Sequence, residues 1–232
     1  MFNGKMKALT FSYDDGVKQD VRLIEILNKY NLKCTFNINS ELLGTPNTLL
    51  LEGKEIAHNK VAPEDVKYIY QGHEVAVHTL THPRLTMHDK DEIIRQVEQD
   101  RLNLSELCGY EVIGMAYPCG GVNNDDRVAE IIKNNTGVRY SRTITTTDNF
   151  DLQNNLYRFN PSVYHMDFDK MFELGERFLA LDAKTPQIFY IWGHSYEFDI
   201  HNTYDKFEEF CQMISGKSDI FYGTNKEILL AK

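Results

Sequence analysis

The organisation of this chain follows from one stretch near its N-terminus, Lys7-Ala8-Leu9-Thr10-Phe11-Ser12-Tyr13-Asp14-Asp15-Gly16. Its apolar residues predict a buried strand over 7–13, and two carboxylates come directly after it. The same order recurs where the apolar run 74–77 precedes His78-Thr79-Leu80-Thr81-His82 and where the run 187–192 precedes Gly193-His194. The carboxyl ends of parallel strands meet on one face of a sheet or barrel, so we expect these carboxylates and histidines to share one mouth. Together they would supply a mononuclear metal site, a general base and a general acid.

Strands and helices alternate along the rest of the chain, which indicates a parallel α/β architecture. Strands are expected over 7–13, 34–38, 74–77, 112–116, 138–141, 187–192 and 220–222. Helices are expected over 17–30, 63–71, 89–108, 124–134, 167–181, 203–214 and 224–230. We expect Asp89 or Asp91 to cap the third helix and Gly109 to end it. Residues 40–59 predict an irregular excursion with one short helix at most, and residues 143–155 a polar loop. No repeat or linker is visible, so residues 1–232 are expected to form a single domain.

The composition excludes some partners. The chain has 232 residues and a formal net charge of −9, from 25 basic and 34 acidic side chains. An acidic balance argues against a nucleic-acid partner and against a polybasic membrane contact, because both need a basic face. No stretch approaches the length of a membrane span. Since no targeting segment is visible and the four cysteines are widely spaced, we expect reduced thiols and a cytoplasmic location.

The histidine pair and the carboxylate pair are the strongest chemical signals. His78 and His82 are four residues apart, and neutral imidazoles are common zinc ligands. By spacing alone they could also be surface or capping histidines, but their position at a strand end favours ligands. Of Asp14 and Asp15, one could bind a metal while the other takes a proton from water. The alternative for the carboxylates is a helix-capping cluster, since Asp-Asp-Gly is ordinary turn chemistry.

Two further strand ends carry weaker signals. His194 follows an apolar strand and could donate a proton to a leaving group, because the pKa of a histidine lies near the working range. The alternative is a histidine bonded to a backbone carbonyl. The turn Tyr117-Pro118-Cys119-Gly120-Gly121 could present backbone N–H groups to a developing oxyanion, although for this motif alone a plain loop is the stronger explanation.

The order and setting of these motifs resemble the polysaccharide deacetylase family, carbohydrate esterase family 4. The resemblance spans most of the chain, from Ser12 to His194. The family's first motif, Thr-Phe-Asp-Asp-Gly, is similar to residues 12–16, and its second, His-Ser/Thr-x-x-His, is met in full by residues 78–82. Its third motif resembles residues 115–120, and its last, a strand that ends in histidine, matches residues 192–194.

This resemblance implies a distorted (β/α) barrel of about seven parallel strands. It also implies that a divalent metal, most often Zn²⁺, is bound by Asp15, His78 and His82. Asp14 would then be the general base.

For the rest of the reaction, the resemblance implies that His194 is the general acid and that the backbone N–H of Cys119 faces the oxyanion. The products would be acetate and a free amine.

The chain departs from the family pattern in two places. Many members carry an arginine at the start of the third motif, where this chain has Met115. We hypothesise that Arg142, just after the strand expected over 138–141, replaces it and favours the ionised form of Asp14; the alternative is a surface arginine. The family's fourth motif, an Asp/Trp pair that orients the acid, has no clear match. Its candidates are Asp148, Asp151 and Asp167.

Three functions are compatible with these features. The leading hypothesis is a metal-dependent amide hydrolase that removes the acetyl group from an N-acetylated sugar or polysaccharide. The second is a hydrolase of a small or cyclic amide, as in allantoinase-like relatives of the family, which often change or lose the metal set. The third is a barrel that binds carbohydrate without turnover. In either carbohydrate case Tyr117 and Trp192, with Tyr13 and Tyr196, could stack on sugar rings, unless they pack the barrel mouth as core residues.

Overall fold

The computed structural model describes residues 1–231, and its centre is one curved sheet in which all the named strands pair in parallel. Along the sheet the order is β7 (Tyr140–Arg142), β6 (Gly114–Ala116), β5 (Glu74–Val77), β2 (Cys34–Ile38), β1 (Lys7–Asp14), β9 (Gln187–Gly193) and β8 (Val163–Tyr164). A further strand, β10 (Ile220–Tyr222), pairs with the first residues of β1, while β2 pairs with the last ones.

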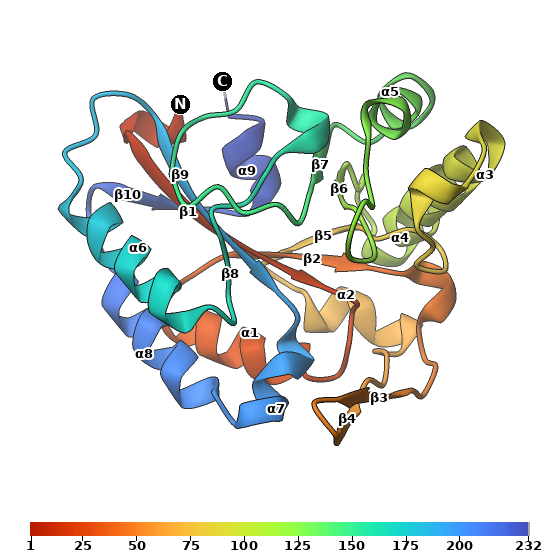
Figure 1. Cartoon of the computed structure of the whole chain (residues 1–232), viewed down its shortest axis with the longest axis horizontal. Coiled ribbons are helices and arrows are strands. Elements are labelled where there is room, and N and C mark those ends of the chain that lie inside the picture. Colours follow the sequence, from red (N-terminus) through yellow and green to blue (C-terminus); the bar gives the residue numbers. More distant parts are fainter. Residues whose placement is uncertain (232) are drawn as a thin grey trace.

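The two edges of the sheet meet through one connecting segment. Phe159 bridges Arg142 of β7 in parallel, and the chain then enters β8, which pairs with β9. The backbone N–H of Phe159 donates to Ser141 O at 2.9 Å, and that of Thr143 donates to Phe159 O at 2.9 Å. The sheet therefore curls into a distorted (β/α) barrel, as expected from the sequence, with the helices on its outside (Figure 1).

The helices that cover the barrel follow the strands in turn. They are α1 (Asp20–Lys29), α2 (Val66–Ile69), α3 (Lys90–Ile94), α4 (Asp100–Cys108), α5 (Asp126–Asn135), α6 (Phe168–Ala180), α7 (Phe198–His201), α8 (Tyr204–Ile214) and α9 (Asn225–Leu229). A wider turn over Arg95–Gln99 joins α3 to α4, so the two form the long helix expected over 89–108. The side chain of Asp89 caps its start by accepting from Glu92 N, and Gly109 ends it with φ +75°.

Side chains along β1 point alternately to the two faces of the sheet, and this alternation determines which of them enter the barrel. Every residue of β1 is buried, as expected for a parallel strand covered on both faces. Leu9, Phe11 and Tyr13 belong to the apolar core packed against the helices, and the ring centroid of Phe11 lies 5.8 Å from that of Phe207 in α8. Because successive side chains of a strand point to opposite faces, Asp14 belongs to the other face, inside the barrel.

Several local predictions were wrong, mostly for short elements. Residues 48–57 form a hairpin of β3 (Thr48–Leu51) and β4 (Lys54–Ala57), not an irregular excursion. Glu52 and Gly53 have φ of +50° and +76°, as a tight two-residue hairpin turn requires. The two-residue β8 and the four-residue α7 were not expected, because elements of this length carry almost no periodicity. The helix expected over 63–71 is reduced to a 3₁₀ turn over Pro63–Asp65 followed by α2.

Within residues 1–231, none of the helices combines the length and the apolar character needed to cross a membrane. The four cysteines are free; three of them are buried and Cys119 is partly exposed.

Candidate active site

A cavity of about 270 Å³ opens at the carboxyl ends of β1, β5, β6 and β9. Its wall contains most of the polar residues that the sequence singled out. The lining residues are Asp14, Asp15, His78, His82, Tyr117, Cys119, Gly120, Ile144, Trp192, His194 and Tyr196. The expected shared mouth is therefore present, built from strand ends that are far apart in the chain.

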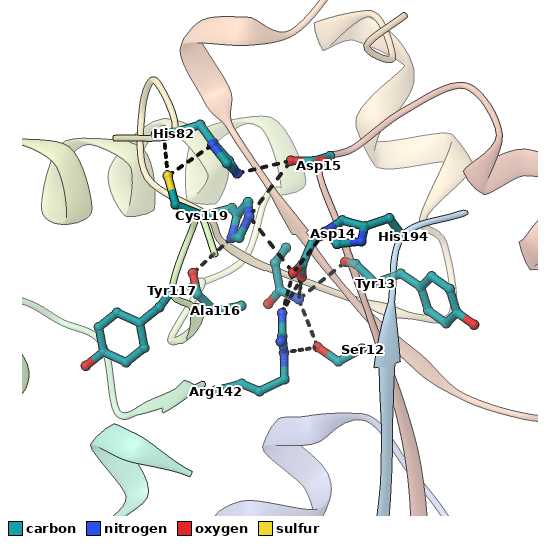
Figure 2. Close-up of polar contacts among 12 residues, drawn as sticks. Ser12, Tyr13, Asp14, Asp15, His82, Ala116, Tyr117, Cys119, Arg142 and His194 are labelled. Atoms are coloured by element: carbon teal, nitrogen blue, oxygen red, sulfur yellow. Dashed lines mark hydrogen bonds and ion pairs between the residues drawn. The ribbon is translucent and has the colours of Figure 1, made fainter. Parts of the chain in front are cut away.

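Asp15, His78 and His82 place one ligand atom each within 4.8 Å of one another. Nε2 of His82 lies 3.5 Å from Oδ1 of Asp15 (Figure 2). Nε2 of His78 lies 3.8 Å from the same oxygen. On the far side of its ring, Nδ1 of His78 lies 2.9 Å from Ala116 O, so Nδ1 carries the proton and Nε2 offers its lone pair. Burial lowers the pKa of His78 to about 4 and lowers that of His82, so both imidazoles are in the neutral, ligating form. This donor set fits a divalent ion such as Zn²⁺ and leaves further positions open.

The backbone around these residues is held in rarely populated conformations. Asp15, Thr79, His82 and Cys119 all have positive φ, at +85°, +69°, +62° and +67°. Gly16 follows with φ +62°, and a Cβ there would lie 2.7 Å from Cγ2 of Ile38. Such strain persists only where surrounding contacts over-determine it, and it gathers at functional sites.

Asp14 has different contacts from the three candidate ligands, because its carboxylate is bound by side chains inside the barrel. Nη2 of Arg142 contacts both of its carboxylate oxygens at 2.5 Å, and Nδ2 of Asn37 donates to Oδ1 at 2.9 Å. Arg142 is fully buried, donates through Nε to Ser12 Oγ at 3.2 Å, and stacks 4.7 Å above the ring of Trp192. The structure thus places Arg142 against Asp14 in the way that the sequence hypothesis required (Figure 2). Charge-assisted contacts of this kind are short and directional, so they hold the Asp14 carboxyl group in one orientation.

His194 faces Asp14 from the end of β9, with its Nε2 4.0 Å from Oδ2 of Asp14. Its Nδ1 lies 3.0 Å from Oε2 of Glu197, which also contacts Nε2 of His165 at 2.7 Å. Burial opposes the charged form of His194, but the charge and hydrogen bond of Glu197, with the charges of Asp15 and Asp14, raise its pKa to about 9. The same contacts lower the pKa of Glu197 despite its burial. His194 therefore carries its proton at neutral pH.

The comparisons with known proteins agree with this arrangement. Residues 2–140 match the sequence profile described as polysaccharide deacetylase. The chain belongs to this family. It is 27% identical over 129 residues to a peptidoglycan-N-acetylglucosamine deacetylase, PgdA, of Listeria monocytogenes. It is also 27% identical over 128 residues to a peptidoglycan-N-acetylmuramic acid deacetylase, PdaC, of Bacillus subtilis. Each match covers 54% of this chain and 24% of the relative, so the matched region is about a quarter of the relatives' length.

Solved structures of the family share the fold over nearly the whole chain. A variant of the peptidoglycan deacetylase PdaC from Bacillus subtilis superposes with a TM-score of 0.59 at 16% identity, covering 97% of this chain and 91% of that one. A carbohydrate esterase family 4 pseudoenzyme from Bacillus anthracis gives 0.58 at 19% identity, with coverages of 99% and 66%. At these identities the similarity establishes the fold alone.

The carboxylate that orients the histidine at the end of β9 is one that the sequence hypothesis missed. Among the described residues it is Glu197, and not one of the candidates Asp148, Asp151 and Asp167. The side chain of Asp167 instead caps α6. A local signal did exist, because a Glu three residues after a helix-starting residue is a capping pattern, and Glu197 also accepts from the backbone N–H of His194 at 3.1 Å.

Of the other residues suggested from the sequence, Tyr117, Cys119, Trp192 and Tyr196 line the cavity. Tyr13 does not, because it packs in the apolar core. Cys119 is on the rim, with Sγ 3.8 Å from Nδ1 of His82. Tyr117 is 1% exposed and donates its hydroxyl to Tyr157 O at 2.8 Å, and Trp192 is 8% exposed. Both rings are therefore largely occupied by packing, which leaves only their edges for a substrate.

Residues 58–61, which follow β4, also reach the site, and nothing in the sequence pattern singled them out. Nε2 of His58 lies 3.2 Å from Oδ2 of Asp15, and Nζ of Lys60 donates to Asp15 O at 2.7 Å. A second cavity of about 420 Å³ begins here and shares Asp15, His82 and Tyr196 with the first.

Proposed function

We propose that this protein is a metal-dependent hydrolase that removes the acetyl group from an N-acetylated sugar and releases acetate. Membership of the polysaccharide deacetylase family supports hydrolysis of an amide bond in acetylated carbohydrate. The observation that carries the proposal is the geometry around Asp14. Its Oδ2 lies 4.0 Å from Nε2 of His78, a candidate ligand, and 4.0 Å from Nε2 of His194, a candidate acid. Base, acid and metal donors thus surround one small volume.

The residues present fit a divalent ion, and we propose Zn²⁺ held by Asp15, His78 and His82. When bound, such an ion supplies Lewis acidity toward the acetyl carbonyl and the attacking water. The His78 contact to Ala116 O fixes the ring that would hold it.

The remaining steps are assigned to this chain's own groups. Asp14, held by Arg142, removes a proton from the water whose oxygen attacks the acetyl carbon. The backbone N–H of Cys119 faces the oxygen on which negative charge develops. His194 then gives its Nε2 proton to the nitrogen as the C–N bond breaks. Acetate and a free amine leave.

The test compares the wild type with His78→Ala and with His88→Ala, a variant of a half-buried histidine outside the cavity. Bound metal is measured in each purified protein, and acetate release is measured with N-acetylglucosamine oligomers. We expect one equivalent of metal and acetate release in the wild type and in His88→Ala, and loss of both in His78→Ala.

Two outcomes would contradict the proposal. If the wild type binds no metal even after reconstitution with Zn²⁺ or Co²⁺, the ligand assignment is wrong. If metal is bound but no acetylated sugar is hydrolysed, the site belongs to a hydrolase of small or cyclic amides or to a carbohydrate-binding protein, and a panel of amides separates these.

A further inference from the structure

The chain that leaves the β3–β4 hairpin runs antiparallel to the turn that carries Asp15. Val17 and Lys60 form an antiparallel bridge. The backbone N–H of Lys18 donates to Asn59 O at 2.9 Å, and that of Val61 donates to Gly16 O at 3.0 Å. Residues 58–61 therefore hold both sides of the turn after β1, although they are more than forty positions away in sequence.

Within this segment, two side chains divide their contacts between the backbone and the carboxylate of Asp15. Nζ of Lys60 donates to the Asp15 carbonyl at 2.7 Å, which anchors a residue whose φ is +85°. Nε2 of His58 lies 3.2 Å from Oδ2. The opposite oxygen, Oδ1, is the one that faces Nε2 of His82 and Nε2 of His78. Nζ of Lys60 also lies 3.7 Å from Oδ1. His58 therefore contacts one carboxylate oxygen of Asp15, whereas Lys60 and the two candidate ligand histidines face the other.

The His58 ring is itself fixed from two sides. Its Nδ1 lies 3.2 Å from the side-chain nitrogen of Asn47, and its face meets Tyr196 edge-on, with ring centroids 4.8 Å apart. An amide nitrogen is a donor, so Nδ1 accepts and Nε2 carries the proton that Asp15 receives. His58 is 7% exposed and Lys60 5% exposed, so water competes little with either contact.

We infer that His58 is a positioning residue of the metal centre, which donates to Oδ2 of Asp15 and so presents Oδ1 alone as the ligand oxygen. Residues 59–61 support this by holding the Asp15 backbone in its left-handed conformation. The segment between β2 and α2, which contains the β3–β4 hairpin, then supports the metal centre as well as lining the second cavity. Ligating carboxylates are oriented by such outer hydrogen bonds, and their loss weakens metal binding. The inference rests on the metal site of the proposed function.

The test measures Zn²⁺ affinity of the metal-free protein by competition with a chromophoric chelator, so it needs no substrate. His58→Phe keeps a ring against Tyr196 but has no donor, whereas His58→Gln keeps a donor. His201→Ala is the matched control, because this exposed histidine contacts Glu52 at the tip of the same hairpin, away from Asp15. We expect His58→Phe to weaken Zn²⁺ binding by about 10- to 100-fold, and His58→Gln and His201→Ala to stay within about threefold of the wild type.

Folding is checked by thermal unfolding of each metal-free variant. An affinity of His58→Phe equal to that of the wild type would overturn the inference, and so would a His58→Gln variant as weak as His58→Phe. If His58→Phe does not fold, the comparison of His58→Gln with His58→Ala decides by the same criterion. A wild type that binds no Zn²⁺ would instead contradict the proposed function. If the variants show the expected Zn²⁺ affinities but the wild type releases no acetate, the proposed function is wrong and the role of His58 is supported.

Discussion

Replacing Glu197 with Gln tests how the candidate acid is controlled. Glutamine keeps an oxygen that can accept from Nδ1 of His194, so the ring stays oriented while the negative charge is removed. Glu197 is largely buried, and its Oε2 contacts both His194 at 3.0 Å and His165 at 2.7 Å. In a buried site the charge of a partner has its full effect, because water screens it poorly.

The size of the effect follows from the pKa of His194, which the surrounding carboxylates raise from 6.5 to about 9. At 1.36 kcal/mol per pKa unit this is on the order of 3 kcal/mol in favour of the protonated ring. Glu197 is the main source, but Asp15 and Asp14 also contribute and remain in the variant. We therefore expect the pKa of His194 to fall by roughly 1 to 2 units in Glu197→Gln.

The sign of the pH effect follows from the proposed role of His194 as the general acid. A raised pKa keeps the proton on the ring until the pH passes the raised value, so activity is lost on the alkaline side. The variant should work nearly as well as the wild type near pH 6. At about pH 8.5 it should be slower by roughly tenfold, because most of its His194 has lost the proton.

The assay is the pH dependence of kcat/KM for acetate release from N-acetylglucosamine oligomers. Glu173→Gln, which changes an exposed glutamate of α6, is the control and should leave the profile unchanged. An alkaline limb at the same pH in Glu197→Gln and in the wild type would refute the reasoning. A uniform loss at every pH would mean that Glu197 acts on orientation alone.

Two further variants test the barrel interior. Arg142→Met leaves the buried Asp14 without its cation, so we expect a loss of about 3 to 5 kcal/mol in unfolding free energy by urea titration, together with loss of turnover; a change below about 1 kcal/mol would count against the pairing. Gly193→Ala places a Cβ against the ring of His165, so we expect it to destabilise the protein by about 1 to 3 kcal/mol in thermal unfolding. Gly120→Ala meets no atom within 4 Å and is the stability control; equal melting temperatures of the two glycine variants would contradict the predicted clash.

Much of the fold and the candidate metal donors could be predicted from local patterns. The apolar runs before Asp14, His78 and His194 are strands in the structure, and each run ends where the sequence indicated or one residue later. The hairpin over 48–57 left a weaker signal, the two-residue turn Glu52-Gly53 directly after the apolar run 49–51. Convergence of the polar groups followed from one rule, that parallel strands deliver their carboxyl ends to the same face.

The side chains that contact Asp14, Asp15 and His194 were harder to predict from the sequence. Glu197 is three residues from His194, and this spacing is a helix-capping pattern that the sequence shows. His58 is 43 positions from Asp15, and no local pattern links the two residues. Arg142 was proposed only because Met115 stands where many family members carry an arginine. No local pattern could show its pairing with Asp14, since 128 positions separate the two residues.

Local sequence patterns were enough to place the alternating strands and helices, the strand ends that carry polar groups, and the residue types available there. These depend on periodicity and on turn residues, which act over a few positions. The tertiary structure alone decided that Arg142 reaches across the barrel to Asp14 and that residues 58–61 hold Asp15. Such contacts depend on the register of the whole sheet and on how an irregular segment packs, and both are set by the summed burial of the core and not by neighbours in the chain.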